Sequence, residues 1–104
     1  TLVATRCEFA NSSYGAVVGG SLTSAKFNNC VFHDNTSDGI FGFASTIHLH
    51  GEATAVHSNR YDGISACRNA KVIIHLPSHH TTLYNNRHED RVTTSGGTIT
   101  NVED

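Results

Sequence analysis

Apolar residues recur along this chain in short clusters rather than at helical spacing. The segments AKFN (25–28), IHLH (47–50), VIIH (72–75) and TITN (98–101) are β-branched or alternate apolar with polar residues, and Gly, Ser or Asn bound them. This pattern is typical of short β-strands that end in tight turns. We therefore predict an all-β chain without a long helix.

A second group of clusters repeats at a constant interval. The stretch NTSDGIFG (35–42) returns as NRYDGISA (59–66), so Asn and Asp-Gly-Ile both recur after 24 residues. The row CEFANSSYGAVVGG (7–20) precedes them, and TLYNNRHEDRVTTSGG (82–97) follows after a small insertion near HLPSHH. Rows that match at one period indicate a solenoid in which each repeat stacks on the previous one.

The rows align residues of one type into columns. A turn column holds Asn11, Asn35 and Asn59 with Asn85 or Asn86, and apolar columns hold Ala16, Ile40, Ile64 and Val92; Phe9, Phe32, Val56 and Leu83; and Phe27, Leu49, Ile74 and Ile99. Strand alternation turns the apolar columns inward. The Leu framework of leucine-rich repeats is missing, and helical repeats are longer. We predict a right-handed parallel β-helix of about four coils, each of roughly 24 residues.

The serial N-x-x-DG-[IV] coils resemble the broad β-helix class that includes pectate lyases and related carbohydrate-active proteins. The coils are also similar to those of uncharacterised algal and giant-virus β-helix proteins, as is the closing segment IIHLPSHHTTLYNN (73–86) with GGTITNVED (96–104). This likeness covers nearly the whole chain. It implies the fold but not an activity, because one fold carries many functions.

Length and composition narrow the picture further. A chain of 104 residues is one domain, 1–104, and its start at Thr1 without Met suggests a module from a longer protein. A net charge of −2 without a Lys/Arg cluster argues against nucleic acid as a partner. No apolar run is long enough for a membrane span. Three Cys do not form a disulfide framework, and we expect buried thiols.

Two aromatic residues are expected to face outward. After the bend at Gly39 comes the inward Ile40, so Phe41 and Phe43 should lie side by side on the outside of one strand. Exposed aromatic pairs mark association or binding surfaces. We therefore consider Phe41 and Phe43 a candidate surface for self-association or for stacking against a polysaccharide.

Histidines form a second candidate surface. His33 and His57 lie 24 residues apart, and His50 and His75 fall in one column of adjacent coils; His48 shares a strand face with His50. Stacked imidazoles can chelate Zn²⁺ or Cu²⁺. No third and fourth ligands occur at a familiar spacing, so we predict no metal and no other cofactor. Sensitivity to pH is the expected consequence of stacking.

The acidic residues do not form a recognisable catalytic set. Asp38 and Asp62 stack, but each precedes Gly at a bend, where bonding to local backbone is the default role. We assign no catalytic residues. We expect a non-catalytic structural or binding module, with a carbohydrate-active lyase, epimerase or hydrolase, or a remnant of one, as the alternative. Self-association is expected through the aromatic face or the solenoid ends: nothing at the start resembles a cap, whereas the segment 87–104 suits one at the other end.

Overall fold

The computed structural model describes residues 2–102, and these form short strands without a helix. The strands are β1 (Leu2–Thr5), β2 (Glu8–Ala10), β3 (Ala16–Gly19), β4 (Ser24–Asn28), β5 (Val31–His33), β6 (Ile40–Phe43), β7 (Thr46–His50), β8 (Ala55–His57), β9 (Ile64–Cys67), β10 (Lys71–His75), β11 (Leu83–Tyr84), β12 (Arg91–Thr93) and β13 (Thr98–Asn101). The prediction of an all-β chain is confirmed.

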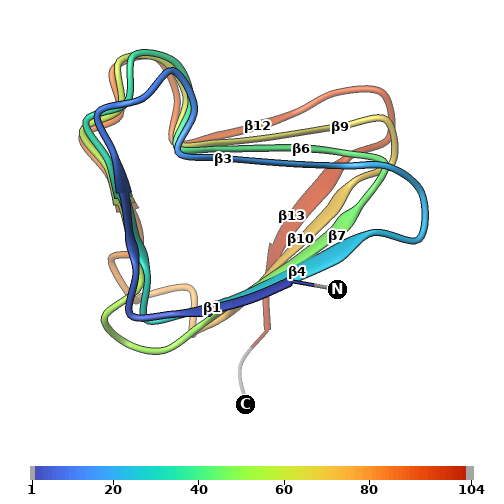
Figure 1. Ribbon diagram of the computed structural model, residues 1–104, viewed down its shortest axis with the longest axis horizontal. Coiled ribbons are helices and arrows are strands. Elements are labelled where there is room, and N and C mark those ends of the chain that lie inside the picture. Colours follow the sequence, from blue (N-terminus) through green and yellow to red (C-terminus); the bar gives the residue numbers. More distant parts are fainter. Residues whose placement is uncertain (1, 103–104) are drawn as a thin grey trace.

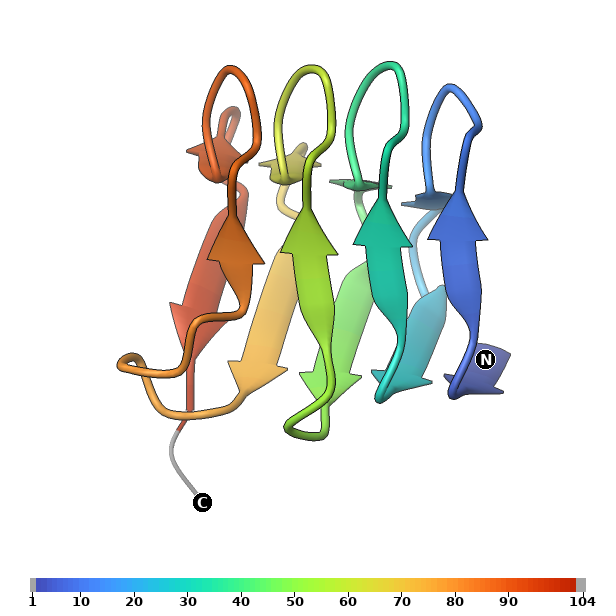
Figure 2. The ribbon, with the colours of Figure 1, turned by 90° about the vertical axis from the view of Figure 1, so that its left-hand side faces the viewer.

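Three parallel sheets form the sides of a triangular solenoid (Figure 1). Their strand orders are β1-β4-β7-β10-β13, β11-β8-β5-β2 and β12-β9-β6-β3. Each coil adds one strand to every sheet, and Figure 2 shows the coils side by side from the N-terminus to the C-terminus. In Figure 1 the chain turns clockwise as it moves away from the viewer, so the solenoid is right-handed. The predicted solenoid of about four coils of roughly 24 residues is confirmed.

Inward side chains stack into a continuous core. Phe9 pairs with Phe32, Phe32 with Val56 and Val56 with Leu83, as the sequence predicts. The Phe9 and Phe32 rings stack with centroids 5.0 Å apart, and Phe27 meets Phe32 edge-on at 5.1 Å. Phe27 is 2 % exposed and Phe32 fully buried. Burial of each such side chain contributes about 1.5–3 kcal/mol, so these columns carry much of the stability.

The register of the last coil differs from the prediction. Ile99 pairs with Val72 and so belongs to the neighbouring column, and Arg91 rather than Val92 pairs with Ile64. The insertion between β10 and β11 removes the constant spacing that sets the register of the earlier coils. Polar residues therefore occupy core columns at the C-terminal end.

A ladder of asparagine side chains runs through one corner of the solenoid. Asn35 Nδ2 donates to Asn59 Oδ1 and Asn59 Nδ2 donates to Asn86 Oδ1, both at 2.9 Å. Each amide also donates to a backbone carbonyl of the preceding coil, such as Phe32 O for Asn59, at 3.2 Å. Asn35 and Asn59 are buried, so the ladder satisfies polar groups that have no access to water.

The first and last members of this ladder needed correction or choice. Asn11 is not in it, because the backbone N–H of Ser12 occupies that place and donates to Asn35 Oδ1 at 3.2 Å. Asn11 and Asn85 instead have positive φ angles of 58° and 55°, which Asn tolerates better than most residues. Asn86 is the fourth member. The loop of the first coil is one residue shorter, which explains the shift at Asn11.

Candidate functional site

The N-terminal end of the solenoid, meaning the open side of β1, β2 and β3, exposes the core. Its inward positions are apolar: Leu2 pairs with Ala25, Phe9 with Phe32, and Ala16 with Ile40. A hollow of about 480 Å³ opens there, and Leu2, Phe9, Ala16, Val18 and Phe27 contribute to its lining. Leu2 is 54 % exposed. This end therefore presents apolar surface that the later coils bury.

The C-terminal end is built differently. Arg91 and Thr93 of β12 and Asn101 of β13 occupy inward positions. Arg91 Nη2 donates to Asn101 Oδ1 at 2.7 Å, and Asn101 Nδ2 donates to the Leu76 carbonyl at 2.8 Å. Burial lowers the pKa of Arg91 from its ordinary value, while Asp90 opposes that shift. Hydrogen-bonded polar side chains thus cover this end, which agrees with the cap expected from the segment 87–104 for its described part.

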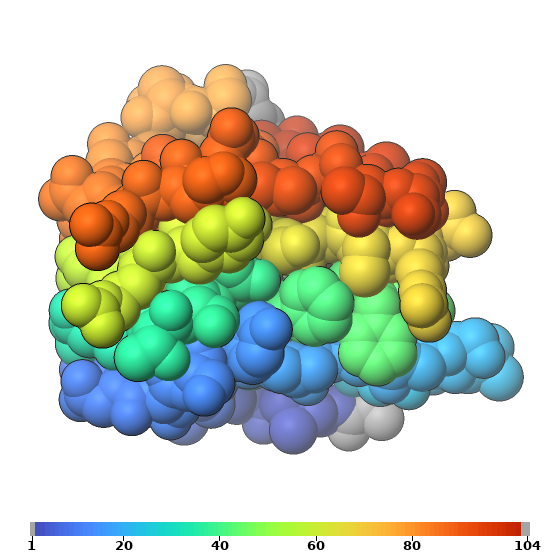
Figure 3. All heavy atoms as spheres, turned by 90° about the horizontal axis from the view of Figure 1, so that it is seen from above, coloured from blue at the N-terminus to red at the C-terminus, as the bar shows by residue number. Residues whose placement is uncertain are grey.

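Phe41 and Phe43 lie on the outer face of β6, as predicted, with ring centroids 5.9 Å apart. Both are only partly exposed, because Phe41 packs against Tyr14 at 5.6 Å and the Phe43 ring lies over Gly19. These three rings form an aromatic patch on the face of β3, β6, β9 and β12 (Figure 3). A hollow of about 270 Å³ beside it is lined by Phe41, Phe43, Cys67 and Arg68.

The predicted histidine pair on β5 and β8 is present and extends to a third ring. His33 and His57 stack with centroids 5.1 Å apart, and His57 stacks on Tyr84 at 4.8 Å. His33 Nε2 contacts Glu8 Oε2 at 2.6 Å, and its Nδ1 contacts Asp34. The geometry therefore gives the two imidazoles different surroundings.

These surroundings shift the two pKa values in opposite directions. Hydrogen bonds to Glu8 and Asp34 raise the pKa of His33 above 6.5, so its stabilising contribution is present below pH 6.5 and is lost as pH rises through the folded value. Burial and the neighbouring His33 lower the pKa of His57. The folded chain then resists protonating His57, and stability is lost as pH falls from 6.5 through the lowered value.

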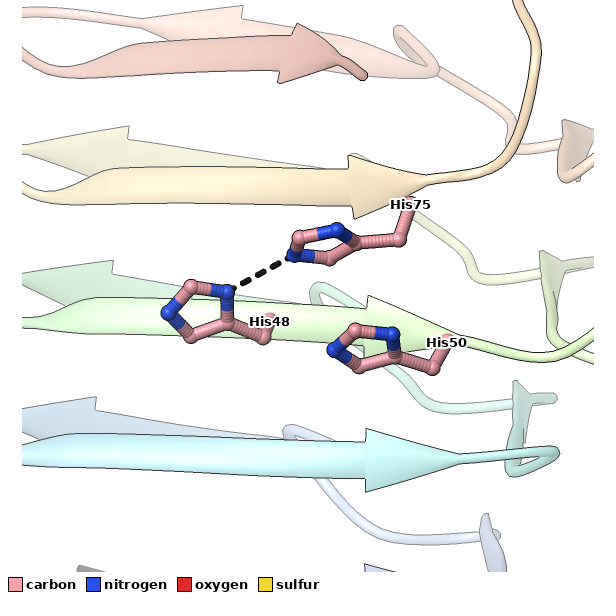
Figure 4. A group of neighbouring side chains, drawn as sticks. All are labelled: His48, His50 and His75. Carbon is pink, nitrogen blue, oxygen red and sulfur yellow. Dashed lines mark hydrogen bonds between the residues drawn. The ribbon is translucent and has the colours of Figure 1, made fainter. Parts of the chain in front are cut away.

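The second predicted pair, His50 and His75, is joined by His48. His50 pairs with His75 in the register of β7 and β10, and their rings stack at 3.9 Å. His48 Nδ1 and His75 Nε2 share a hydrogen bond of 2.9 Å (Figure 4). We call His48, His50 and His75 the histidine cluster. One nitrogen from each ring lies within 4.8 Å of the others. Burial lowers the pKa of His48, and His75 and Lys26 lower it further.

The contact between His48 and His75 was missing from the sequence reasoning. These residues are not opposite each other, since Ile73 pairs with His48. Their rings meet diagonally across adjacent strands, where neighbours lie within reach of long side chains. A search for His residues at i and i+2 on one strand that face a third on the next strand would have found the cluster.

Asp38 and Asp62 stack at the bend and serve the fold. Asp38 Oδ1 accepts the backbone N–H of Asp62 at 3.0 Å, and Asp62 Oδ1 contacts His88 Nδ1 at 2.7 Å. Both are buried, and burial raises the pKa of Asp38. The bend role predicted for these acids accounts for the backbone contact of Asp38.

Comparison with known proteins finds no family model, no curated protein and no solved structure that matches this chain. The parallel β-solenoid is therefore shown by the structure alone. Within residues 2–102, no helix is long and apolar enough to cross a membrane.

Proposed function

We propose that this chain is a non-catalytic β-solenoid module that pairs with a second copy of itself through the N-terminal end. The observation that carries the proposal is the uncovered apolar core at that end. In the described part of the chain, seven large hydrophobic residues are exposed, and five of them lie in the first coil: Leu2, Val3, Tyr14, Val17 and Leu22. Exposed apolar surface gathered in one region marks an association site.

Backbone groups support the same surface. The outer edges of β1, β2 and β3 lie at the margins of their sheets, and unpaired edges are templates for pairing with another chain. The first 24 residues carry one positive and one negative side chain, Arg6 and Glu8, so two copies of this end do not repel each other.

The strand count favours two N-terminal ends meeting rather than head-to-tail stacking. One sheet has five strands and the others have four, so β13 projects one strand beyond β11 and β12. A neighbour that pairs β1 with β13 would leave a gap over β11, and one that pairs β2 with β11 would place β1 on β13. A two-fold axis across the N-terminal end avoids this conflict and brings the edge strands together antiparallel.

The size of the surface predicts a weak dimer. The solenoid spans 28 × 28 Å across its axis, so a triangular end offers roughly 400 Å² per copy, or ~800 Å² in all, below the usual size of stable interfaces. We therefore expect a monomer–dimer equilibrium that depends on concentration.

Sedimentation equilibrium over a concentration series tests the proposal. The mass should rise from 11.2 kDa toward twice that value. Leu2→Glu, at an exposed position of the N-terminal end, should abolish the rise, whereas Val102→Glu, equally exposed at the opposite end, should leave it unchanged. A chain that stays monomeric at its highest soluble concentration, or that Val102→Glu dissociates as effectively, would contradict the proposal.

Polysaccharide binding at the aromatic patch is the second candidate. The hollow beside Phe41 and Phe43 supports it, because Arg68 offers donors next to aromatic rings, a combination that suits an acidic sugar. Affinity electrophoresis in alginate and pectin gels should show retardation that Phe43→Ala removes. Equal mobility of Phe43→Ala and the parent chain would exclude this site. The resemblance to pectate-lyase-like and algal or viral β-helix proteins belongs to this proposal and is supported by the coil length and the Asn ladder.

A further inference from the structure

We propose that the histidine cluster, His48, His50 and His75, binds a divalent transition-metal ion, Cu²⁺ or Zn²⁺, on the outer face of β7 and β10. This site is separate from the N-terminal end and from the aromatic patch. It is formed by residues of two coils and needs no second copy.

The positions of the nitrogen atoms suit a shared ion. Metal–imidazole bonds of about 2.0–2.1 Å place two ligands of a tetrahedral ion roughly 3.3 Å apart. His48 Nδ1 and His75 Nε2 are already 2.9 Å apart, and the whole set lies within 4.8 Å. Figure 4 shows a nitrogen of His50 and one of His75 turned toward the His48 side. Small rotations of the rings therefore suffice, and the ion takes the place of the proton between His48 and His75.

The backbone beneath the cluster is held firmly. β7 and β10 pair over five residues in the interior of a five-stranded sheet. Ile47 and Leu49 flank His48 on the inward side and are fully buried, as are Val72 and Ile74 of β10. Ligands on a rigid sheet lose little conformational freedom on binding, which favours affinity.

The chemistry of the ligands selects the ion. The cluster contains imidazoles and no carboxylate, so it suits Cu²⁺, Ni²⁺ and Zn²⁺ rather than Ca²⁺ or Mg²⁺. Cu²⁺ should bind most tightly, following the general order of affinities for nitrogen ligands. Three protein ligands leave the remaining positions of the ion to water.

One neighbouring charge opposes binding and gives a test. Lys26 of β4 pairs with His48 in the sheet register, and its ammonium group influences His48 electrostatically. A positive charge beside the site repels a cation, so its removal should strengthen binding. Loss of a merely structural lysine would not have this effect.

Isothermal titration calorimetry with CuCl₂ and with ZnCl₂, at pH near 7.5, measures the binding. The parent chain should bind one ion, and His48→Gln, His50→Gln and His75→Gln should each lower the affinity at least ~10-fold. His57→Gln is the matched control, since it removes a stacked histidine from a different sheet, and should leave the affinity unchanged. Lys26→Gln should bind more tightly.

Spectroscopy and folding controls complete the experiment. Electron paramagnetic resonance of the Cu²⁺ complex should show coupling to three nitrogens, and to two in the His50→Gln variant. Circular dichroism without metal checks that each variant folds. The proposal is overturned if the parent chain binds neither ion, if folded cluster variants keep its affinity, or if His57→Gln weakens binding as strongly as they do.

Discussion

Replacement of Asn59 by Ala tests how much the Asn ladder stabilises the solenoid. The Asn59 side chain is 1 % exposed and holds two coils together. Its Oδ1 accepts both the backbone N–H and the side-chain amide of Asn35, at 3.2 and 2.9 Å. Its Nδ2 donates to Phe32 O and to Asn86 Oδ1, at 3.2 and 2.9 Å.

The cost of the substitution follows from which partners are replaced. Asn86 Oδ1 keeps the backbone N–H of residue 59, and Asn35 Nδ2 keeps the Phe9 carbonyl. The Asn35 backbone N–H and the Phe32 carbonyl each lose a partner in a buried region. At about 1–3 kcal/mol for each such group, the free energy of unfolding should fall by roughly 2–6 kcal/mol. That is a large part of the ~5–15 kcal/mol typical of a domain.

Urea unfolding followed by far-ultraviolet circular dichroism provides the measurement. The midpoint should fall for Asn59→Ala while the slope stays unchanged, and the melting temperature should drop by at least ~8 °C. Arg60→Ala changes the exposed neighbour in the chain and should alter stability by less than ~0.5 kcal/mol. If Asn59→Ala is no more destabilising than Arg60→Ala, the ladder does not contribute as argued.

Three further changes probe the core, the bend and the titrating side chains. Phe32→Ala should cost about 3–5 kcal/mol in urea unfolding, and a cost under ~1 kcal/mol would refute its central place in the core. Gly63→Ala should lower the melting temperature, because its Cβ would lie 2.6 Å from Asn86 Nδ2; an unchanged melting temperature would show that the ladder yields easily. From about pH 7 to pH 5, His33→Gln should lose more stability than the parent chain and His57→Gln less, measured as urea midpoints; shifts of the same sign would contradict the assigned pKa directions.

The sequence predicted the solenoid because equal residue types recur at equal spacing in its middle coils. Phe32 and Val56, for example, occupy the predicted column. The prediction was wrong at Ile99 and Val92, where an insertion breaks the constant spacing and neighbouring apolar residues offer more than one register. At Asn11 the shorter loop of the first coil shifted the turn column by one residue, which a row of similar letters does not reveal.

The candidate sites were predictable to a smaller extent. Stacking of His33 on His57 and of His50 on His75 follows from equivalent places in adjacent coils. The contact of His48 with His75 is diagonal and depends on how the rings lean, which spacing alone does not determine. The partial burial of Phe43 depends on Gly19 one coil away, where the missing side chain leaves room for the ring.

The difference between the two ends should also give the molecule a direction of unravelling. In the first coil the inward side chains pack on one side only, whereas Phe32 and Val56 are enclosed from both sides. Amide protons should therefore exchange fastest in β1 to β3, more slowly toward β7 and β8, and at an intermediate rate in the last coil, where Arg91 and Asn101 close the core. Opening then proceeds coil by coil from the N-terminus, as in other repeat proteins whose units contact only their neighbours.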